Sequence, residues 1–525
     1  MISRRKVLKG GAIAAVAAAI PLIRVREAQA QTASTFDYYI SPNGDDNNSG
    51  TLASPWSITA LNSKQSVYGG KRVGIIGDQG LIQYGTVGGV RHTLYSLYQA
   101  APASSQVLML NGGPSASQPT YLASCNSSGA YSARLAIIDA SDPATGNKPT
   151  VEATLIAQNT YFGYGSVANW GNATVDGLTI RNFTFAALKF YGSSGTSTQI
   201  NNVIIKNCEI YNGQNVASNN NPGAIWFDGA VGALVTNNLI HDLQTDSAGS
   251  TSPWALLGYI QFNSFGMKVT NCTFYNCVAV SQKDRWQQLE VSYCYLGFGT
   301  FGSAYNGGAL MSATVHNYLT GTGLTNNFHH NICIGPVDLD GESTGAQNEG
   351  QVNIYNNTFY GPVVSGSHKM DAIYCNLGNQ GGHWAFYNNL VYSPYGYDGA
   401  ASSNKPGSMY VTTINSNPSW FSQCDYNAYG AGMTFGYGWN PGQYALPFST
   451  WKGYGLDAHS VQLASNPFTG TPSEANATSF AITGPATTAG VGGAMCGALD
   501  GSGPVGCNFA GSQGLVPKAP ALTVT

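Results

Sequence analysis

The sequence predicts an all-β protein built as a parallel β-helix, a solenoid whose successive coils stack through parallel strands. Two observations lead to this prediction: a short strand-like unit recurs through the middle of the chain, and the composition is apolar but poor in charge. Only 9% of the 525 residues are charged, whereas 43% are hydrophobic and 11% aromatic. A chain of this composition can bury a large core, so a disordered protein is excluded.

Each copy of the repeat has alternating apolar residues, a polar pair and one more apolar step. Alternation of this kind is typical of strands, and an Asn in the pair tolerates the left-handed backbone of a tight bend. The copies follow one another at steps of 22 to 37 residues, so coils of fixed size would carry loops of variable length. A β-propeller would need a steadier period of about 40 to 45 residues. The copies lie at 178–185, 203–210, 234–240, 269–274, 291–296, 330–333, 354–359 and 386–391.

The second residue of each polar pair is predicted to stack on its equivalents in neighbouring coils, about 4.8 Å apart. Asn238, Asn331, Asn357 and Asn389 would form a ladder of side-chain amides. Cys208, Cys272 and Cys294 would fill the same column. His241 stands where other coils have Tyr, which predicts a place in an aromatic stack, and His329 and His330 are expected to shape a turn.

Residues 1–30 have the features of an export signal. A basic segment containing Arg4 and Arg5 precedes an apolar run of about 14 residues, which is too short to span a bilayer. The small residues of Ala28–Ala30 would suit a signal peptidase. The paired arginines resemble a twin-arginine signal, although an ordinary secretory signal is the alternative. We therefore expect a bacterial protein, periplasmic or secreted, with no membrane anchor after cleavage.

The charge balance limits the partners. Residues 1–30 contain six basic residues and one acidic residue, so the rest of the chain has a net charge of about −8. A nucleic-acid partner is not expected, because such binding requires a basic patch. We expect a monomer. The ten cysteines show no zinc-finger spacing, and Cys496 and Cys507 are the best candidates for a disulfide.

The chain resembles the right-handed parallel β-helix proteins of the pectate-lyase-like superfamily. The resemblance lies in the segments 36–46 and 50–56, in Asp425–Asn427, and in Gly455–Ser460 followed by Asn466–Phe468. It covers roughly residues 36 to 500 and implies a carbohydrate-active protein. It does not identify a reaction, because lyases, glycosidases and epimerases share this fold. The catalytic motifs of pectate lyases, polygalacturonases and mannuronan epimerases are absent.

We predict four regions: a signal peptide at 1–30, a first strand, cap and irregular coils at 31–170, regular coils at 171–430, and a C-terminal coil and tail at 431–525. The resemblance implies that the strand before each repeat unit lines a substrate cleft. Alternation within these strands sends Ile225, Phe227, Val337 and Leu339 inward. Substrate-binding residues would be the outward Trp226, Asp228, Asn263 and Tyr374. The predicted strands are 187–190, 224–228, 259–263, 278–283, 309–311, 337–340 and 372–376.

Three carboxylates gather at one strand end. Asp338 and Asp340 share a face, and Glu342 follows after a glycine. In a chain so poor in charge their repulsion requires compensation, so a Ca²⁺ site at Asp338, Asp340 and Glu342 is one interpretation. A glycosidase carboxylate set and a solvated turn are the alternatives.

The polar triplet Lys283, Asp284 and Arg285 ends a predicted cleft strand two coils earlier. The resemblance implies lyases that remove a proton beside a uronate carboxyl with Lys, Arg or His, often with calcium. This favours catalytic roles for Lys283, Arg285 and Asp340 in β-elimination on a uronate-containing polysaccharide. A glycoside hydrolase using Asp228, Asp338, Asp340 and Glu342 and a non-catalytic glycan-binding protein stay open as alternatives.

Overall fold

The computed structural model describes residues 35–79, 93–96, 108–141, 153–158, 171–184, 186–191, 200–213, 223–243, 254–259, 265–275, 277–281, 288–297, 313–317, 323–335, 337–341, 350–361, 373–376, 383–392, 409–411, 421–437, 446–472, 477–502, 505–509 and 512–513. The leader predicted at 1–30 lies outside these residues. Within them, no helix is long and apolar enough to cross a membrane.

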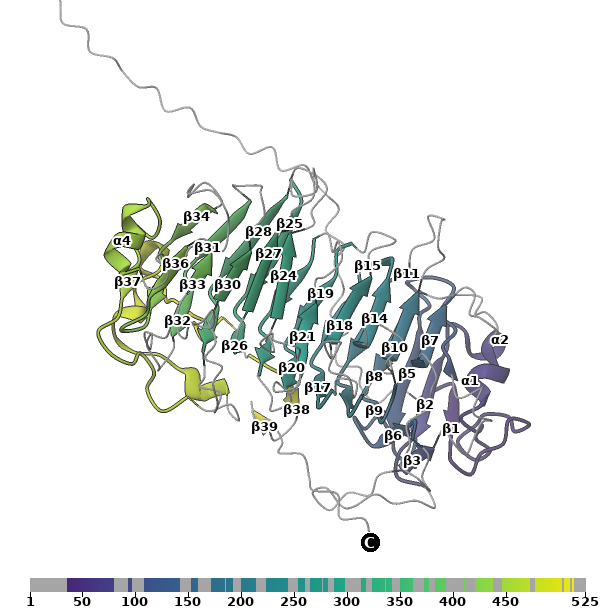
Figure 1. Ribbon diagram of the computed structural model, residues 1–525. Helices are drawn as coiled ribbons and strands as arrows, with labels where there is room; N and C mark the ends of the chain where they lie inside the picture. The colour runs from purple at the N-terminus through teal and green to yellow at the C-terminus, as the bar shows by residue number, and fades with distance from the viewer. Residues whose placement is uncertain are drawn as a thin grey trace, which may run out of the picture. The chain divides into compact units, whose positions relative to one another are not determined.

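The chain folds as an all-β, right-handed parallel β-helix, as predicted (Figure 1). Successive coils add one strand each to three parallel sheets, named here sheet 1, sheet 2 and sheet 3 in the order in which a coil visits them. Sheet 1 contains β1 (Tyr38–Ile40), β2 (Arg72–Ile76), β5 (Thr120–Cys125), β8 (Ala173–Asp176), β12 (Val203–Lys206), β16 (Leu234–Thr236), β19 (Lys268–Thr270), β22 (Glu290–Ser292), β25 (Thr325–His329), β28 (Gln351–Tyr355), β31 (Trp384–Tyr387) and β34 (Phe421–Asp425).

The other two sheets also gain one strand from each successive coil. Sheet 2 contains β3 (Thr93–Ser96), β6 (Ala136–Asp139), β9 (Thr179–Arg181), β13 (Glu209–Tyr211), β17 (Leu239–His241), β20 (Thr273–Tyr275), β23 (Tyr295–Leu296), β26 (Ile332–Ile334), β29 (Thr358–Tyr360), β32 (Leu390–Tyr392), β35 (Ala428–Tyr429) and β37 (Val461–Gln462). Sheet 3 contains β4 (Leu108–Met109), β7 (Ala153–Gln158), β10 (Ala186–Tyr191), β14 (Gly223–Asp228), β18 (Trp254–Tyr259), β21 (Val278–Ser281), β24 (Ala313–Asn317), β27 (Val337–Gly341), β30 (Ile373–Asn376), β33 (Met409–Val411) and β36 (Phe435–Tyr437).

Short elements flank the sheets. Near the N-terminal end, the helices α1 (Ala60–Ser63) and α2 (Gln65–Tyr68) contribute buried Leu61 and Tyr68 to the same core cluster as the coils, in the region of the predicted cap. The helix α4 (Phe448–Gly453) buries Trp451 near the other end. The remaining elements are the strand pairs β11 (Ile200–Asn201) with β15 (Ala230–Val231) and β38 (Asn508–Phe509) with β39 (Ser512–Gln513), and the 3₁₀ turns η5 (Ala477–Phe480), η6 (Gly484–Thr487) and η7 (Val491–Gly493).

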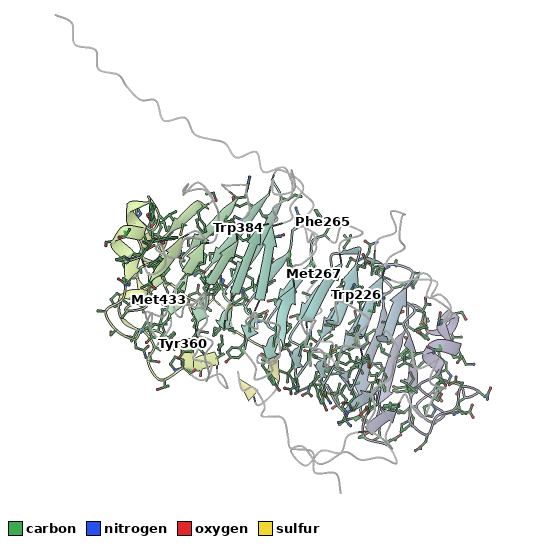
Figure 2. All side chains as sticks on the ribbon, in the orientation of Figure 1. Trp226, Phe265, Met267, Tyr360, Trp384 and Met433 are labelled. Atoms are coloured by element: carbon green, nitrogen blue, oxygen red, sulfur yellow. The ribbon has the colours of Figure 1, made fainter. Side chains whose placement is uncertain are left out.

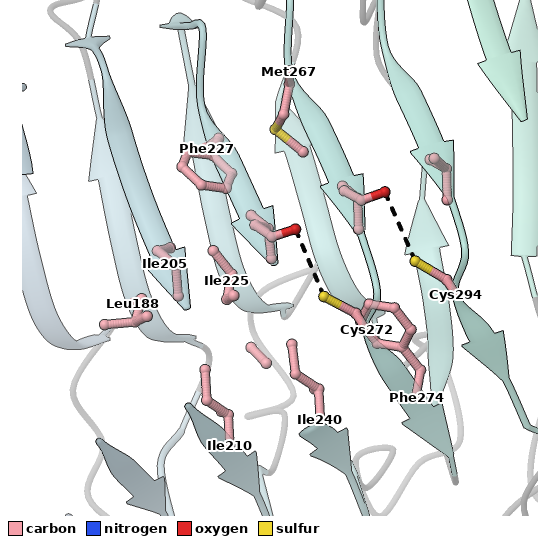
Figure 3. Close-up of a cluster of buried hydrophobic side chains, with 14 of the residues drawn as sticks. Leu188, Ile205, Ile210, Ile225, Phe227, Ile240, Met267, Cys272, Phe274 and Cys294 are labelled. Atoms are coloured by element: carbon pink, nitrogen blue, oxygen red, sulfur yellow. Dashed lines mark hydrogen bonds between the residues drawn. The ribbon is translucent and has the colours of Figure 1, made fainter. Parts of the chain in front are cut away.

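The interior of the solenoid is packed with aliphatic and aromatic side chains from all three sheets. Ile205, Ile210 and Ile225 represent sheets 1, 2 and 3, and each is fully buried (Figure 3). The thiols of Cys272 and Cys294 lie in this core and donate weak hydrogen bonds to backbone carbonyls in the preceding coil, at 3.7 and 3.8 Å. The coils therefore share one continuous core, as burial of apolar surface requires.

The turn between sheet 1 and sheet 2 confirms the predicted ladder. The first residue of each polar pair is left-handed, as at Asn237 and Asn356, with φ of 53° and 54°. The second residue points inward, and its side-chain oxygen accepts from the backbone N–H of the coil before: Asn331 donates to Asn357 at 3.0 Å and Asn357 to Asn389 at 3.0 Å. This asparagine ladder comprises Asn238, Asn331, Asn357, Asn389 and Asn427, and Cys208, Cys272 and Cys294 occupy the same column.

The predicted disulfide between Cys496 and Cys507 is wrong. Both cysteines are free and buried. The Cys496 thiol donates to the carbonyl of Tyr426, near β35, whereas the backbone N–H of Cys507 donates to Thr273 in β20. Five strand steps of sheet 2 separate β20 from β35, which is about 24 Å at the usual spacing. A disulfide needs Cα atoms within about 7 Å, so the pair is much too far apart.

Candidate functional site

Sheet 3 carries polar residues on the face opposite the core. In β14 and β27 the alternate residues Ile225, Phe227, Val337 and Leu339 are fully buried in the solenoid interior, as predicted. The residues between them belong to the other face of the sheet. Because the strands pair in register, these residues form two rows that run from coil to coil, named here row 1 and row 2. Row 1 contains Lys189, Trp226, Leu257, Ser281, Thr314, Asp338, Tyr374 and Tyr410, and row 2 contains Tyr191, Asp228 and Tyr259 and, further along, His316, Asp340 and Asn376.

The chemistry-bearing part of the rows lies on β24, β27 and β30. His316 pairs in register with Asp340, which pairs in turn with Asn376. In the adjacent row Thr314 pairs with Asp338. These three strands are consecutive in the sheet, and neighbouring strands lie about 4.8 Å apart. Together their residues provide an imidazole, two carboxylic acids, a hydroxyl and an amide.

His316 was missed by sequence reasoning, which predicted the strand of this coil at 309–311, outside the described residues. The strand lies at Ala313–Asn317, where Val315 pairs in register with buried Leu339. The alternation of Val315 with Thr314 and His316 is the signal that could have located it. The strand β18 also departs from its predicted range of 259–263, but in the opposite direction, since it lies at Trp254–Tyr259.

At the N-terminal end of the rows the side chains are buried. Figure 2 marks Trp226 on this sheet, and the Lys189 ammonium lies 4.5 Å from the centroid of its ring. Lys189 is 4% exposed, Trp226 9% and Asp228 0%. Trp226 and Asp228 thus lie on the predicted face. Because both are buried in this conformation, they offer almost no surface that a polymer in solvent could contact.

Asp228 is also remote from the acidic strand. Four strand steps of sheet 3 separate β14 from β27, which corresponds to about 19 Å. Glycosidases that invert require carboxyl groups about 6.5–9.5 Å apart, and those that retain require less. Asp228 therefore cannot form a catalytic pair with Asp338 or Asp340 in this arrangement. This removes one member of the carboxylate set considered for a hydrolase.

The other predicted site residues are placed only in part. For Asp338, Asp340 and Tyr374 the structure gives the strand and its register, and Lys283, Arg285, Glu342 and Asn263 lie outside the described residues. Among the residues that are described, no group of three or more His, Cys, Asp or Glu side chains is arranged to hold a metal ion. The catalytic, substrate-binding and calcium roles of these residues stay predictions.

His241 and His330 lie outside sheet 3, and both have the structural roles that were predicted for them. His241 is stacked between Tyr211 and Tyr275, with ring centroids 4.9 and 4.5 Å away. Burial lowers the pKa of His241, but hydrogen bonds to Asp242 and Glu209 outweigh it, so the pKa is raised. His330 is the left-handed turn residue before the ladder residue Asn331.

Comparison with known proteins gives a likeness of fold. No protein-family model matches the chain, and no curated protein matches its sequence. Among solved structures, the chain is similar to pectate lyase Pel9A, with 15% identity, coverage of 68% of this chain and 75% of the other, and a TM-score of 0.38. It is also similar to XylC in complex with xylose (12%, 76% and 84%, 0.37) and to a PL6-family polysaccharide lyase from Pseudopedobacter saltans (10%, 86% and 98%, 0.34). The fold assignment rests on the strands of this chain, and its chemistry has to be argued from its own residues.

Proposed function

We propose that this protein is an exported polysaccharide lyase that cleaves a uronate-containing polymer by β-elimination on the outer face of sheet 3. The observation that supports this most directly is the register of β24 with β27, which pairs His316 with Asp340 and Thr314 with Asp338. A lyase needs a base and a means of neutralising the substrate carboxylate, and both residue types occur here on adjacent strands. The buried Lys189 and Trp226 lie three to four strand steps away and are not part of this centre.

The reaction cleaves the glycosidic linkage without adding water. A base removes the proton next to the uronate carboxylate, the electron pair forms a carbon–carbon double bond, and the bond to the glycosidic oxygen breaks. The departing oxygen then takes up a proton. In our proposal His316 is the base, since a neutral imidazole titrates near pH 6.5 and can accept this proton at neutral pH. Lys283 and Arg285 are the other candidates.

Asp338 and Asp340 are proposed to hold a calcium ion. Calcium prefers oxygen ligands, and Asn376, which pairs in register with Asp340, would add an amide oxygen to the two carboxylates. When bound, such an ion would offset the charge of the substrate carboxylate and so favour loss of the neighbouring proton. The same ion would reconcile a polyanionic substrate with a chain whose net charge is negative.

The test is an assay on a panel of neutral and acidic polysaccharides, with calcium and with a chelator. We expect ultraviolet absorbance of an unsaturated uronate and new reducing ends to appear together on an acidic polymer, and to be lost with His316→Gln. His383→Gln is the matched control, because His383 lies at the start of a sheet 1 strand and away from the rows. Reducing ends without the absorbance would indicate a hydrolase instead. Binding with neither signal would indicate a glycan-binding protein.

A further inference from the structure

The C-terminal segment forms a strap across the outside of sheet 2. We define the strap as residues 496–502 and 505–507. Its backbone N–H groups step from coil to coil: Gly497 donates to Asn388 at 3.0 Å, Ala498 to Thr358 at 3.0 Å, and Cys507 to Thr273 at 2.9 Å. Cys496, Ala498 and Val505 are buried against Ile332, Leu390 and Tyr295 of the sheet. The strap therefore covers an apolar surface that the coils alone would leave in water.

Two glycines let the strap lie close to the sheet. Gly497 and Gly506 have φ of 109° and 87°, which favour glycine, and a Cβ atom at either would come within 2.9 Å of a threonine hydroxyl. The strap therefore lies too close to the sheet at both positions to accept a side chain. Between them, its one described acidic side chain, Asp500, contacts the turn that precedes β26.

At that turn a chain of titratable groups connects the strap to sheet 1. Asp500 accepts a hydrogen bond from the Nε2 atom of His330 at 2.9 Å and from the amide of Asn356 at 3.1 Å. The Nδ1 atom of His330 lies 2.7 Å from the Nδ1 atom of His329. The Nε2 atom of His329 lies 3.9 Å from Glu290, which is paired with Lys268 at 2.9 Å. Tyr293 stacks on His330, and Tyr355 stacks on His329.

Two imidazole nitrogens 2.7 Å apart can be bridged by one proton, since one nitrogen must donate and the other accept. Full protonation of both rings would place two N–H groups against each other and two positive charges on neighbouring rings. One ring would have to turn away. If His330 turns, its hydrogen bond to Asp500 breaks with it.

We propose that His329 and His330 are an acid-sensitive latch, which holds the strap closed with one proton shared between the two rings and releases it when both rings become fully protonated. This inference is independent of the proposed lyase activity, because it concerns sheet 2 and its cover. The direction of the pKa of His329 agrees with it: burial, followed by the charge of His330, lowers this pKa from 6.5 to about 4. Opening the strap would relieve the burial, so proton uptake and opening favour each other.

The sign of the pH dependence follows from that lowered pKa. Above pH 6.5 His329 is neutral whether the strap is closed or open, and the closed form has its full stability. Between pH 6.5 and about 4 only the open form binds the proton, so opening becomes progressively more favourable. Asp500 acts in the same direction at lower pH, because its hydrogen bonds to Ser502 and His330 outweigh burial and lower its pKa.

Hydrogen exchange of the full chain, corrected for the intrinsic effect of pH, tests the latch. We expect the amides of Gly497, Ala498, Gly506 and Cys507 to lose protection at least 10-fold between pH 6.5 and pH 4, while amides of the asparagine ladder stay protected. Loss of both together would be global unfolding and would refute the latch. Equal strap protection at both pH values would refute it as well.

Variants separate the latch from other sources of acid sensitivity. His329→Gln keeps a polar partner without a titrating proton, so its strap protection should be independent of pH over this range, and a variant that behaves like the wild type would overturn the proposal. Gly506→Ala should expose the strap at every pH through its steric conflict with Thr273. It defines the open state without changing a titratable group.

Discussion

The corner between sheets 1 and 2 and the outer face of sheet 3 use similar residue types in opposite ways. At the corner each ladder amide is buried and hydrogen-bonded to the coils on both sides, so its polarity serves the fold. On sheet 3, His316, Asp338 and Asp340 take register positions that alternate with Val315 and the buried Leu339. Polar residues that repeat in every coil indicate structure, whereas polar residues confined to two or three coils indicate chemistry.

The sharpest test of this difference is whether substitutions on sheet 3 lower activity while the stability of the protein stays the same. His316→Gln and Asp340→Asn should each lower kcat about 10²- to 10⁴-fold, the usual contribution of a general base or of a group that stabilises developing charge. Both variants should unfold within about 0.5 kcal/mol of the wild type, as substitutions outside the core usually do. Thermal unfolding measured beside the lyase assay checks both statements. A variant that loses activity because it unfolds would show that these residues belong to the fold.

The converse is expected in the ladder. Asn357→Ala removes the acceptor of the Asn331 N–H and leaves the Phe328 carbonyl without its amide donor, both in the buried interior. Unsatisfied buried groups cost about 1–3 kcal/mol each, so we expect a loss of about 3 kcal/mol in the free energy of unfolding.

The matched control for this ladder variant is Asn353→Ala. Asn353 lies in β28, the strand that precedes Asn357, is half-buried, and donates to Asn327 at 2.9 Å. Its loss should cost about 1 kcal/mol, the net value of an ordinary hydrogen bond. Denaturant unfolding compares the two variants, and equal losses would contradict a special role of the ladder. Residual activity of Asn357→Ala at low temperature should be unchanged.

A smaller effect is expected at His241, where a titratable ring stands in a structural stack. Its pKa is raised in the folded state, so protonation stabilises the fold fully below pH 6.5, and this stabilisation is lost as the pH rises through the folded pKa. The size of this loss reports how far folding raises the pKa of His241. Unfolding measured from pH 6 to 9 should show this loss in the wild type and not in His241→Gln. An identical pH profile in both proteins would place the titration elsewhere.

The sequence predicted the coils because their determinants are local. The alternation of Val203, Ile205 and Ile210 and the left-handed Asn207 specify two strands and a turn within eight residues. The site was harder to locate, since Ala309–Met311 looks as strand-like as Val315 and its neighbours. Alternation also assigns Asp228 to a face without revealing whether other segments cover it.

The strap could not be predicted at all. Its contacts join residues 70 to 234 positions apart, for example Cys496 with Tyr426 and Cys507 with Thr273, and no period in the sequence marks them. The disulfide prediction failed for the same reason. It treated Cys496 and Cys507 as neighbours in a tail, whereas the tail extends across five strand steps of sheet 2.

The smallest effect is expected where charges lie outside both the ladder and the rows. Lys268 and Glu290 form an ion pair of 2.9 Å on sheet 1, and their side chains are 48% and 31% exposed. Exposed pairs of this kind contribute about 0–1 kcal/mol, because water screens them and two long side chains lose freedom. Lys268→Ala should therefore change the free energy of unfolding by no more than about 0.5 kcal/mol and leave activity unaltered. A larger loss, measured by denaturant unfolding at low and high salt, would show that charge on sheet 1 supports the fold. Charged residues on sheet 1 would then form a third class of polar residues, which support the fold without repeating in every coil.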